Sequence, residues 1–315
     1  MSRACFPAAE PMREAFAWVP AGACDCHVHI FGPYAEFPLA EDRSYTPPEA
    51  TAAHLDRMVA GMGFSRAVIV TATGYNFDNR SLEDALRADP KNRRGIAVLP
   101  PDCPPAYLRR LNDLGVKGIR LNLYRRGSEK VYRGGAGLDT LRQLGPAIAE
   151  MGWHVQVWVT TVDLAEVLPE LQKFSGPIVI DNMGRVVPSK MKGDRGFALL
   201  CSLLRNDRFH VKVSGPNRLS ENGGDFRDVD PVAQALISAG EDKVVWGSDW
   251  PHVAHFDRAP PAEAALLQTF YRWTDSDRQR RKLLVDNPAA LYGFLPVTGP
   301  RGSGSRRGGE SFHAP

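Results

Sequence analysis

The 315-residue sequence lacks several features that would point away from a compact enzyme. No apolar run approaches the roughly 20 residues that a membrane-spanning helix requires. The first 20 residues show no basic segment followed by an apolar one, so no signal peptide is expected. The formal net charge is only +3, too small to indicate nucleic-acid binding. We therefore expect a cytoplasmic protein with no membrane or nucleic-acid partner. The oligomeric state is left open.

Cysteine is also scarce, and its number is odd. The five cysteines are Cys5, Cys24, Cys26, Cys103 and Cys201. An odd number in a chain without a recognisable leader favours reduced thiols over a disulfide framework.

Short runs rich in β-branched residues alternate with longer amphipathic segments such as Pro48–Met62, Leu138–Met151 and Pro231–Ala239. The predicted strands are Cys24–Ile30, Ala67–Val70, Gly95–Leu99, Gly118–Leu121, His154–Val159, Ile178–Ile180, Val211–Val213 and Val244–Trp246. Eight such units predict an α/β fold, a (β/α)₈ TIM barrel. The alternative, a doubly wound open sheet, usually has a glycine-rich loop after its first strand. We expect one barrel domain over residues 1–296, with an N-terminal extension, and a disordered tail over residues 297–315.

The pattern His27-Val28-His29 is the clearest chemical signal. Side chains alternate faces along a strand, so the two histidines should share one face and Cys24 and Cys26 should lie on the other, packed under the helices. A mixed cysteine and histidine zinc cluster is then unfavourable. Two histidines on an inner face could bind a metal ion or polarise a carbonyl group, or they could be satisfied core residues.

The ends of other predicted strands supply the remaining candidates. Asp249 ends the last strand, where a barrel presents reacting groups, and is a candidate general base; a helix cap is the structural alternative. His252 could orient Asp249 or the substrate. Guanidinium groups bind carboxylates, so several near one mouth indicate a substrate with more than one carboxylate; the candidates are Arg120, Arg126 and Arg218. Tyr45, in the loop after the first strand, could cover the site.

Two segments carry a resemblance to a known family. Asp25-Cys26-His27-Val28-His29-Ile30-Phe31-Gly32-Pro33 and Trp246-Gly247-Ser248-Asp249-Trp250-Pro251-His252 resemble the amidohydrolase-related branch of the amidohydrolase superfamily. Within that branch the chain is most similar to the 2-pyrone-4,6-dicarboxylate hydrolases, which are lactonases of aromatic catabolism. The resemblance covers roughly residues 20–295.

The resemblance implies a hydrolase that opens a small carboxylated lactone. Asp249 would activate water, and His27 and His29 would polarise the lactone carbonyl. The predicted substrate contacts are Arg120, Arg126, Arg218, Tyr45, Thr71, Thr73, Asn182 and His252. Members of this branch can work without a metal ion, so no cofactor is expected.

One position departs from the family pattern. A histidine usually follows the aspartate that ends strand 6, whereas this chain has Asp181-Asn182-Met183-Gly184. Asparagine is a poor metal ligand and carries no proton, which weakens a zinc assignment. The alternatives left open are a hydrolase or decarboxylase with one Zn²⁺ at His27, His29 and Asp249, a lactone isomerase, and a non-catalytic carboxylate-binding barrel.

Overall fold

The computed structural model describes residues 2–127, 129–206 and 208–296. Within these ranges, eight parallel strands form one sheet in the order β12-β11-β10-β9-β6-β5-β4-β2. The strands are β2 (Cys24–Val28), β4 (Arg66–Val70), β5 (Arg93–Ala97), β6 (Val116–Asn122), β9 (His154–Trp158), β10 (Ile178–Ile180), β11 (Phe209–Ser214) and β12 (Val244–Gly247). Each strand overlaps a predicted one, with ends that differ by up to two residues. The predicted (β/α)₈ barrel is confirmed. The predicted tail over 297–315 lies outside the described residues.

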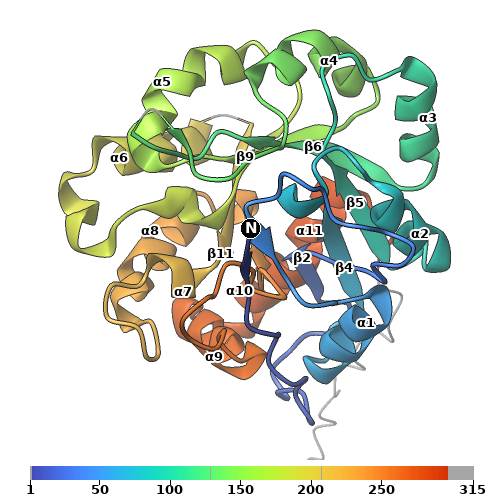
Figure 1. Ribbon diagram of the computed structural model, residues 1–315. Coiled ribbons are helices and arrows are strands. Elements are labelled where there is room, and N and C mark those ends of the chain that lie inside the picture. The colour runs from blue at the N-terminus through green and yellow to red at the C-terminus, as the bar shows by residue number, and fades with distance from the viewer. Residues whose placement is uncertain (1, 128, 207, 297–315) are drawn as a thin grey trace, which may run out of the picture.

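Helices surround this sheet in a ring and follow one another in sequence order (Figure 1). The longer ones are α1 (Ala52–Gly61), α2 (Arg80–Ala88), α3 (Pro105–Asp113), α4 (Leu138–Glu150), α5 (Thr161–Gln172), α6 (Arg195–Asn206), α8 (Asp230–Ala239) and α9 (Glu263–Trp273). Three shorter helices are α7 (Pro216–Leu219), α10 (Asp277–Arg281) and α11 (Asn287–Tyr292). None of the helices in the described ranges is long and apolar enough to cross a membrane.

The first predicted helix begins later than its pattern indicated. It was predicted to start at Pro48, but α1 starts at Ala52 because Thr51 is its N-cap. The backbone N–H of Thr51 donates to Nδ1 of His54 at 3.0 Å. Such a reciprocal cap satisfies amide groups that have no partner within the first turn.

The barrel closes between β2 and the segment that follows β12. The backbone N–H of Asp249 donates to the carbonyl of His27 at 2.9 Å, and the N–H of His29 donates to the carbonyl of Trp250 at 2.8 Å. One carboxylate oxygen of Asp25 accepts bonds from the N–H groups of Ser248 and His27. The first and last strands are thereby joined at the end of the barrel where both carry their polar residues.

The predicted packing of the two strand cysteines is wrong. The pairing register between β2 and β4 shifts between Asp25 and Val28, a β-bulge that changes which positions face inward. Cys24 and Cys26 consequently share a core cluster with Tyr292 and with inner residues of three other strands, Val68, Val70, Ile96 and Val245. The ring of Tyr292 packs edge-on against the ring of His154. His154 lies two residues before Gln156 on β9, so the two side chains share one face of that strand, and Gln156 belongs to the site described below. The cysteines therefore fill the barrel interior.

The N-terminal segment crosses the open end of the barrel. β1 (Arg3–Ala4) pairs in parallel with β3 (Tyr45–Thr46) in the loop after β2. The N–H of Phe6 donates to the carbonyl of His255 at 2.9 Å, and Arg3 forms an ion pair with Asp257. Figure 1 marks the N-terminus near the middle of the helix ring, consistent with these contacts.

Gly247, the last residue of β12, allows the close approach at the closure. A Cβ atom there would lie 2.5 Å from the Cβ and 2.8 Å from the backbone nitrogen of His27. Because this neighbour is backbone, Gly247→Ala should lower the free energy of unfolding by about 1–3 kcal/mol, the usual cost of overpacking. Gly193→Ala is the control, since no atom lies within 4 Å of a Cβ built there. Denaturant unfolding measures both, and equal stability of the two variants would contradict the assigned closure.

Candidate active site

A cavity of about 490 Å³ opens at the carboxyl ends of the strands. It brings together predicted site residues from six separate segments of the chain: Tyr45, Thr73, Arg120, Arg126, Asn182, Arg218 and Asp249. Much of the remaining wall comes from the loop 253–258 and from aromatic residues after β6 and on β9. Val131, Arg185, Asn217 and Ser220 complete the lining. The cavity is therefore a single polar chamber at the mouth of the barrel.

The two histidines of β2 converge on Asp249, as their spacing predicted. Nε2 of His27 and Nε2 of His29 each lie 3.6 Å from Oδ1 of Asp249. The His27 side chain is fully buried, and those of His29 and Asp249 are 4% and 5% exposed. Of the three, only Asp249 lines the cavity, and the two histidines lie behind it.

Asp249 is held ionised by Arg218. Nε of Arg218 donates to Oδ2 of Asp249 at 2.5 Å, while its Nη2 donates to the carbonyl of Val253. Burial alone would raise the pKa of Asp249, but the positive charge of Arg218, the largest opposing influence, holds that pKa well below its usual value. The floor of the cavity thus carries a carboxylate.

The tautomer of His29 follows from its hydrogen bond to the backbone. Nδ1 of His29 lies 2.8 Å from the carbonyl oxygen of Val70, which can only accept a hydrogen bond. Nδ1 must therefore carry a proton, and when the ring holds no second proton Nε2 presents a lone pair toward Asp249. In that state His29 can accept a hydrogen bond from water but has no N–H on Nε2 with which to polarise a carbonyl group, so the carbonyl-polarising role predicted for it stays a prediction.

A second charged cluster lies beneath the histidines. Oδ2 of Asp181 accepts hydrogen bonds from Arg120 and Gln156, both at 3.0 Å. The fully buried Lys212 of β11 donates to Gln156 Oε1 at 2.6 Å and lies 3.9 Å from Oδ1 of Asp181. Burial opposes ionisation of Asp181, but the charges of Arg120 and Lys212, together with the His27 ring whenever it is protonated, prevail and lower its pKa. The cluster is an ionised carboxylate surrounded by cations.

The same cluster keeps His27 neutral. Burial, followed by the positive charge of Lys212, lowers the pKa of His27 to about 4. Burial also lowers the pKa of Lys212, to about 8, so Lys212 remains mostly protonated at neutral pH. At pH 7 the ring of His27 therefore carries one proton, on one of its two nitrogen atoms.

The donor atoms of His27, His29 and Asp249 lie within 4.8 Å of one another and could hold a metal ion. Two histidines and one carboxylate form a ligand set that catalytic zinc sites use. The surrounding charges fit a divalent cation poorly, because Arg218 already neutralises Asp249 and the ammonium of Lys212 lies 3.5 Å from His27 Nδ1. Asn182, where the family pattern has histidine, accepts a hydrogen bond from Ser214 instead.

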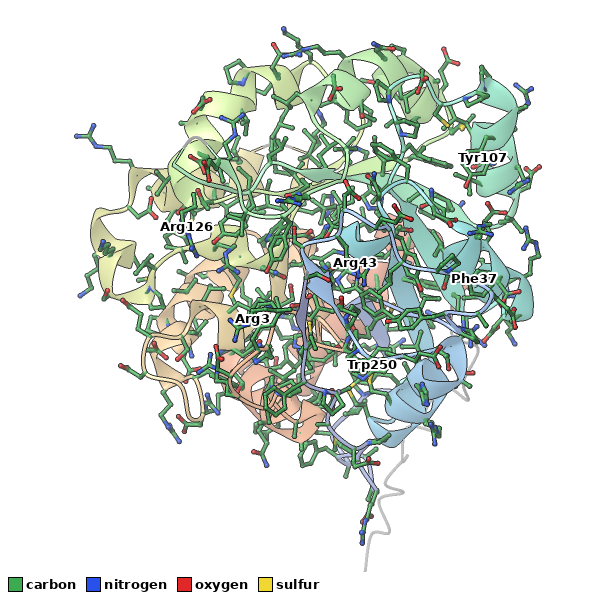
Figure 2. The ribbon with its side chains drawn as sticks, viewed as in Figure 1. Arg3, Phe37, Arg43, Tyr107, Arg126 and Trp250 are labelled. Atoms are coloured by element: carbon green, nitrogen blue, oxygen red, sulfur yellow. The ribbon has the colours of Figure 1, made fainter. Side chains whose placement is uncertain are left out.

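Guanidinium groups and aromatic rings alternate along one wall. Arg120 lies over the ring of Trp158, 4.9 Å from its centroid, and Arg185 lies 4.7 Å over Tyr124. Among the described residues neither Arg126 nor Arg185 forms an ion pair, so both remain available to an anionic ligand. Figure 2 shows Arg126 inside the outline of the helix ring, and the cavity lining places it at the mouth.

Two predicted substrate contacts do not line the cavity. Oγ1 of Thr71 donates to Asn79 at 2.8 Å, away from the opening. Nε2 of His252 lies 3.3 Å from Glu263 at the start of α9. Both residues are buried and make contacts within the protein, and their role as substrate contacts stays a prediction.

Sequence reasoning missed Lys212 and Arg185. Lys212 lies between Val211 and Val213 in a buried strand, and a lysine in such a run was a usable signal, because lysine is almost never fully buried without partners. Arg185 offered no signal, since it reaches the cavity through a turn of positive φ angles that begins at Asn182.

The chain is similar to known proteins over most of its length. The model of the amidohydrolase family matches residues 24–294. A 2-pyrone-4,6-dicarboxylate hydrolase of Comamonas testosteroni is 36% identical over 293 residues, 90% of this chain and 94% of that protein. A 4-sulfomuconolactone hydrolase of Rhizobium radiobacter is 32% identical over 282 residues, covering 88% and 92%. A solved structure from Acinetobacter baumannii, assigned as a 2-pyrone-4,6-dicarboxylic acid hydrolase and containing citric acid, is 26% identical with a TM-score of 0.72 and covers 87% of this chain and 100% of that one.

Removing Arg218 should raise the pKa of Asp249. In Arg218→Met the carboxylate loses its main neutralising charge while burial remains, so Asp249 should bind a proton at higher pH than in the unmodified protein. Titration of the aspartate side-chain ¹³C signals by NMR measures this shift. Arg126→Met is the control, since Arg126 lines the same cavity without pairing with Asp249. An unchanged Asp249 titration in Arg218→Met would contradict the assigned ion pair.

Proposed function

The chain belongs to the amidohydrolase family, and from that premise we propose that it is a hydrolase that opens a small lactone ring bearing carboxylate groups. One observation carries the proposal. A buried, ionised Asp249 lies at the floor of a cavity whose wall is lined by arginine side chains. A carboxylate in that position can accept a proton from water, while the arginines hold an anionic substrate above it.

The proposed reaction divides the work among three side chains. Asp249 takes a proton from a water molecule as that water attacks the lactone carbonyl carbon. The Nε2 lone pair of His29 accepts the second hydrogen of the same water and orients it. His27 donates a hydrogen bond to the carbonyl oxygen as negative charge develops there. When the ring C–O bond breaks, protonated Asp249 returns its proton to the leaving oxygen.

Arg218 connects substrate binding to the basicity of Asp249. A carboxylate with so low a pKa is a weak base, because a general base works best with a pKa near the working pH. A substrate carboxylate bound by Arg218 would share the guanidinium charge that now belongs to Asp249 alone. Binding of the anionic substrate would therefore raise the pKa of Asp249 when water is in place.

The lining of the cavity favours a substrate with more than one acidic group. Arg120, Arg126 and Arg218 come from different segments and are the proposed carboxylate contacts, with Arg185 as an addition. Tyr45, Thr73 and Asn182 line the same chamber as polar contacts for the ring. The relatives act on a pyrone dicarboxylate and a sulfonated lactone, both anionic, and citrate in the Acinetobacter baumannii structure is also a polyacid.

The proposal requires no metal ion. A zinc-dependent hydrolase is the second candidate, because His27, His29 and Asp249 are close enough to bind one ion. Zinc would supply an activated water molecule and polarise the carbonyl. The charges of Arg218 and Lys212 beside these ligands favour the metal-independent reaction.

Asp249→Asn should reduce kcat by roughly 10²–10⁴, the usual loss on removing a general base, because an amide cannot accept the proton of water. Binding of the lactone should persist. Single-turnover hydrolysis of 2-pyrone-4,6-dicarboxylate, a binding titration and thermal melting, all on the same variant, measure this.

Asp257→Asn is the matched control, since Asp257 lines the same cavity but pairs with Arg3 at the surface. Turnover of Asp249→Asn at the unmodified rate would remove Asp249 from the chemistry. A panel that also includes 4-sulfomuconolactone and D-galactarolactone, with product analysis, identifies the ring that is opened and reveals isomerisation if it occurs.

Activity should persist after prolonged treatment with a chelator, because no step of the proposed reaction uses a metal ion. Metal content and turnover are measured on the same treated sample, and Zn²⁺ is then added back. If the chelator removes one equivalent of zinc and the activity is lost with it, and if added Zn²⁺ restores the activity, the zinc-dependent alternative is established.

A further inference from the structure

We propose that Lys212 is a positioning residue that fixes His27 in the tautomer with its proton on Nε2, so that His27 can donate to the substrate carbonyl. The catalytic benefit rests on the proposed function. The tautomer itself does not, because it follows from contacts within the protein.

Lys212 lies next to the ring of His27 and is completely buried. Its ammonium donates to the carbonyl of Cys26 at 2.7 Å and to Oε1 of Gln156 at 2.6 Å. Nδ1 of His27 lies 3.5 Å from the same nitrogen. Since an ammonium has three protons and no lone pair, its remaining proton is available to a lone pair on Nδ1.

The two neutral tautomers of His27 differ in which neighbours they satisfy. With the proton on Nδ1, the ring would gain a bond to Oδ1 of Asp181 at 3.4 Å. It would then direct an N–H at the ammonium of Lys212 and an Nε2 lone pair at Oδ1 of Asp249, 3.6 Å away. The contact with the ammonium is unfavourable in a buried site, where electrostatic interactions are strong. Oδ1 of Asp249, which already faces the Nε2 lone pair of His29, would then face a second lone pair and no donor from either ring.

With the proton on Nε2, two contacts become favourable and one is lost. Lys212 donates to Nδ1, and the Nε2–H points at the carboxylate of Asp249. Oδ1 of Asp181 loses a donor but keeps the ammonium at 3.9 Å. In the described structure Nε2 of His27 is buried with no hydrogen-bond partner, so a carbonyl oxygen that takes a place beside Asp249 would be the acceptor for this N–H.

Lys212 thereby gives the two histidines different tasks. The carbonyl of Val70 fixes His29 with the Nε2 lone pair toward Asp249, and Lys212 fixes His27 with the Nε2 proton toward the same carboxylate. One ring then accepts from water and the other donates to the carbonyl oxygen. With the proton on Nε2, His27 could bind a metal ion only after that proton had moved to Nδ1, since metal ions bind the unprotonated nitrogen.

The test is ¹⁵N NMR of the histidine rings in the full-length, chelator-treated protein at pH 7. In the unmodified protein His27 should show a protonated Nε2 and an unprotonated Nδ1, with His29 as an internal reference of the opposite tautomer. This measurement needs no substrate and no variant. A proton on Nδ1 of His27 would overturn the inference and leave the proposed hydrolysis untouched.

Lys212→Met should move the proton of His27 to Nδ1, toward Asp181, and leave His29 unchanged. On the lactone that the panel identifies, kcat should fall about 10²-fold, the usual effect of losing one donor to a developing oxyanion, with little change in KM. Lys212→Gln keeps an N–H donor and should retain part of the Nε2 tautomer and of kcat. Lys117→Met, on β6, is the control and should change neither. An unchanged His27 tautomer in Lys212→Met would overturn the role of Lys212.

Discussion

The site depends on the closure of the barrel between its first and last strands. Backbone hydrogen bonds join His27 to Asp249 and His29 to Trp250, so the residues proposed to carry the chemistry are also those that complete the sheet. Gly247 permits this approach, and Asp25 accepts hydrogen bonds from both sides of the junction. The positions of the histidines relative to the carboxylate are therefore set by the sheet rather than by a loop, which suits a reaction requiring accurate placement.

Around this junction, buried charges occur in balanced sets. Asp249 is neutralised by Arg218 on the side of the cavity, and Asp181 by Arg120 and Lys212 beneath it. Carboxylates buried this deeply remain ionised only with such partners. In each set one arginine could also bind an anionic substrate, because Arg218 and Arg120 line the cavity. In the proposed reaction, substrate binding is therefore coupled to the state of the buried carboxylates.

One wall of the cavity, after β10, is shaped by local backbone strain. Residues Asn182, Met183, Gly184 and Arg185 all have positive φ angles, which L-residues other than glycine adopt at some cost in free energy. The turn is held by the hydrogen bond between Ser214 and Asn182 and by the stacking of Arg185 on Tyr124. It presents Asn182 and Arg185 to the cavity together, at the position where the family pattern has a histidine. Strain of this kind is commonly found where a backbone positions functional groups.

The sequence alone determined the order of strands and helices, because alternating β-branched and amphipathic runs have periods that only those elements satisfy. It also placed His27 and His29 on one face and Asp249 at the end of the last strand, since both follow from local spacing. Tertiary structure decided the rest. The bulge in β2 turned Cys24 and Cys26 inward, the carbonyl of Val70 set the tautomer of His29, and Lys212 and Arg185 joined the site from distant segments. Register, hydrogen-bond partners and charge compensation depend on which strands become neighbours, and that information exists only once the barrel has closed.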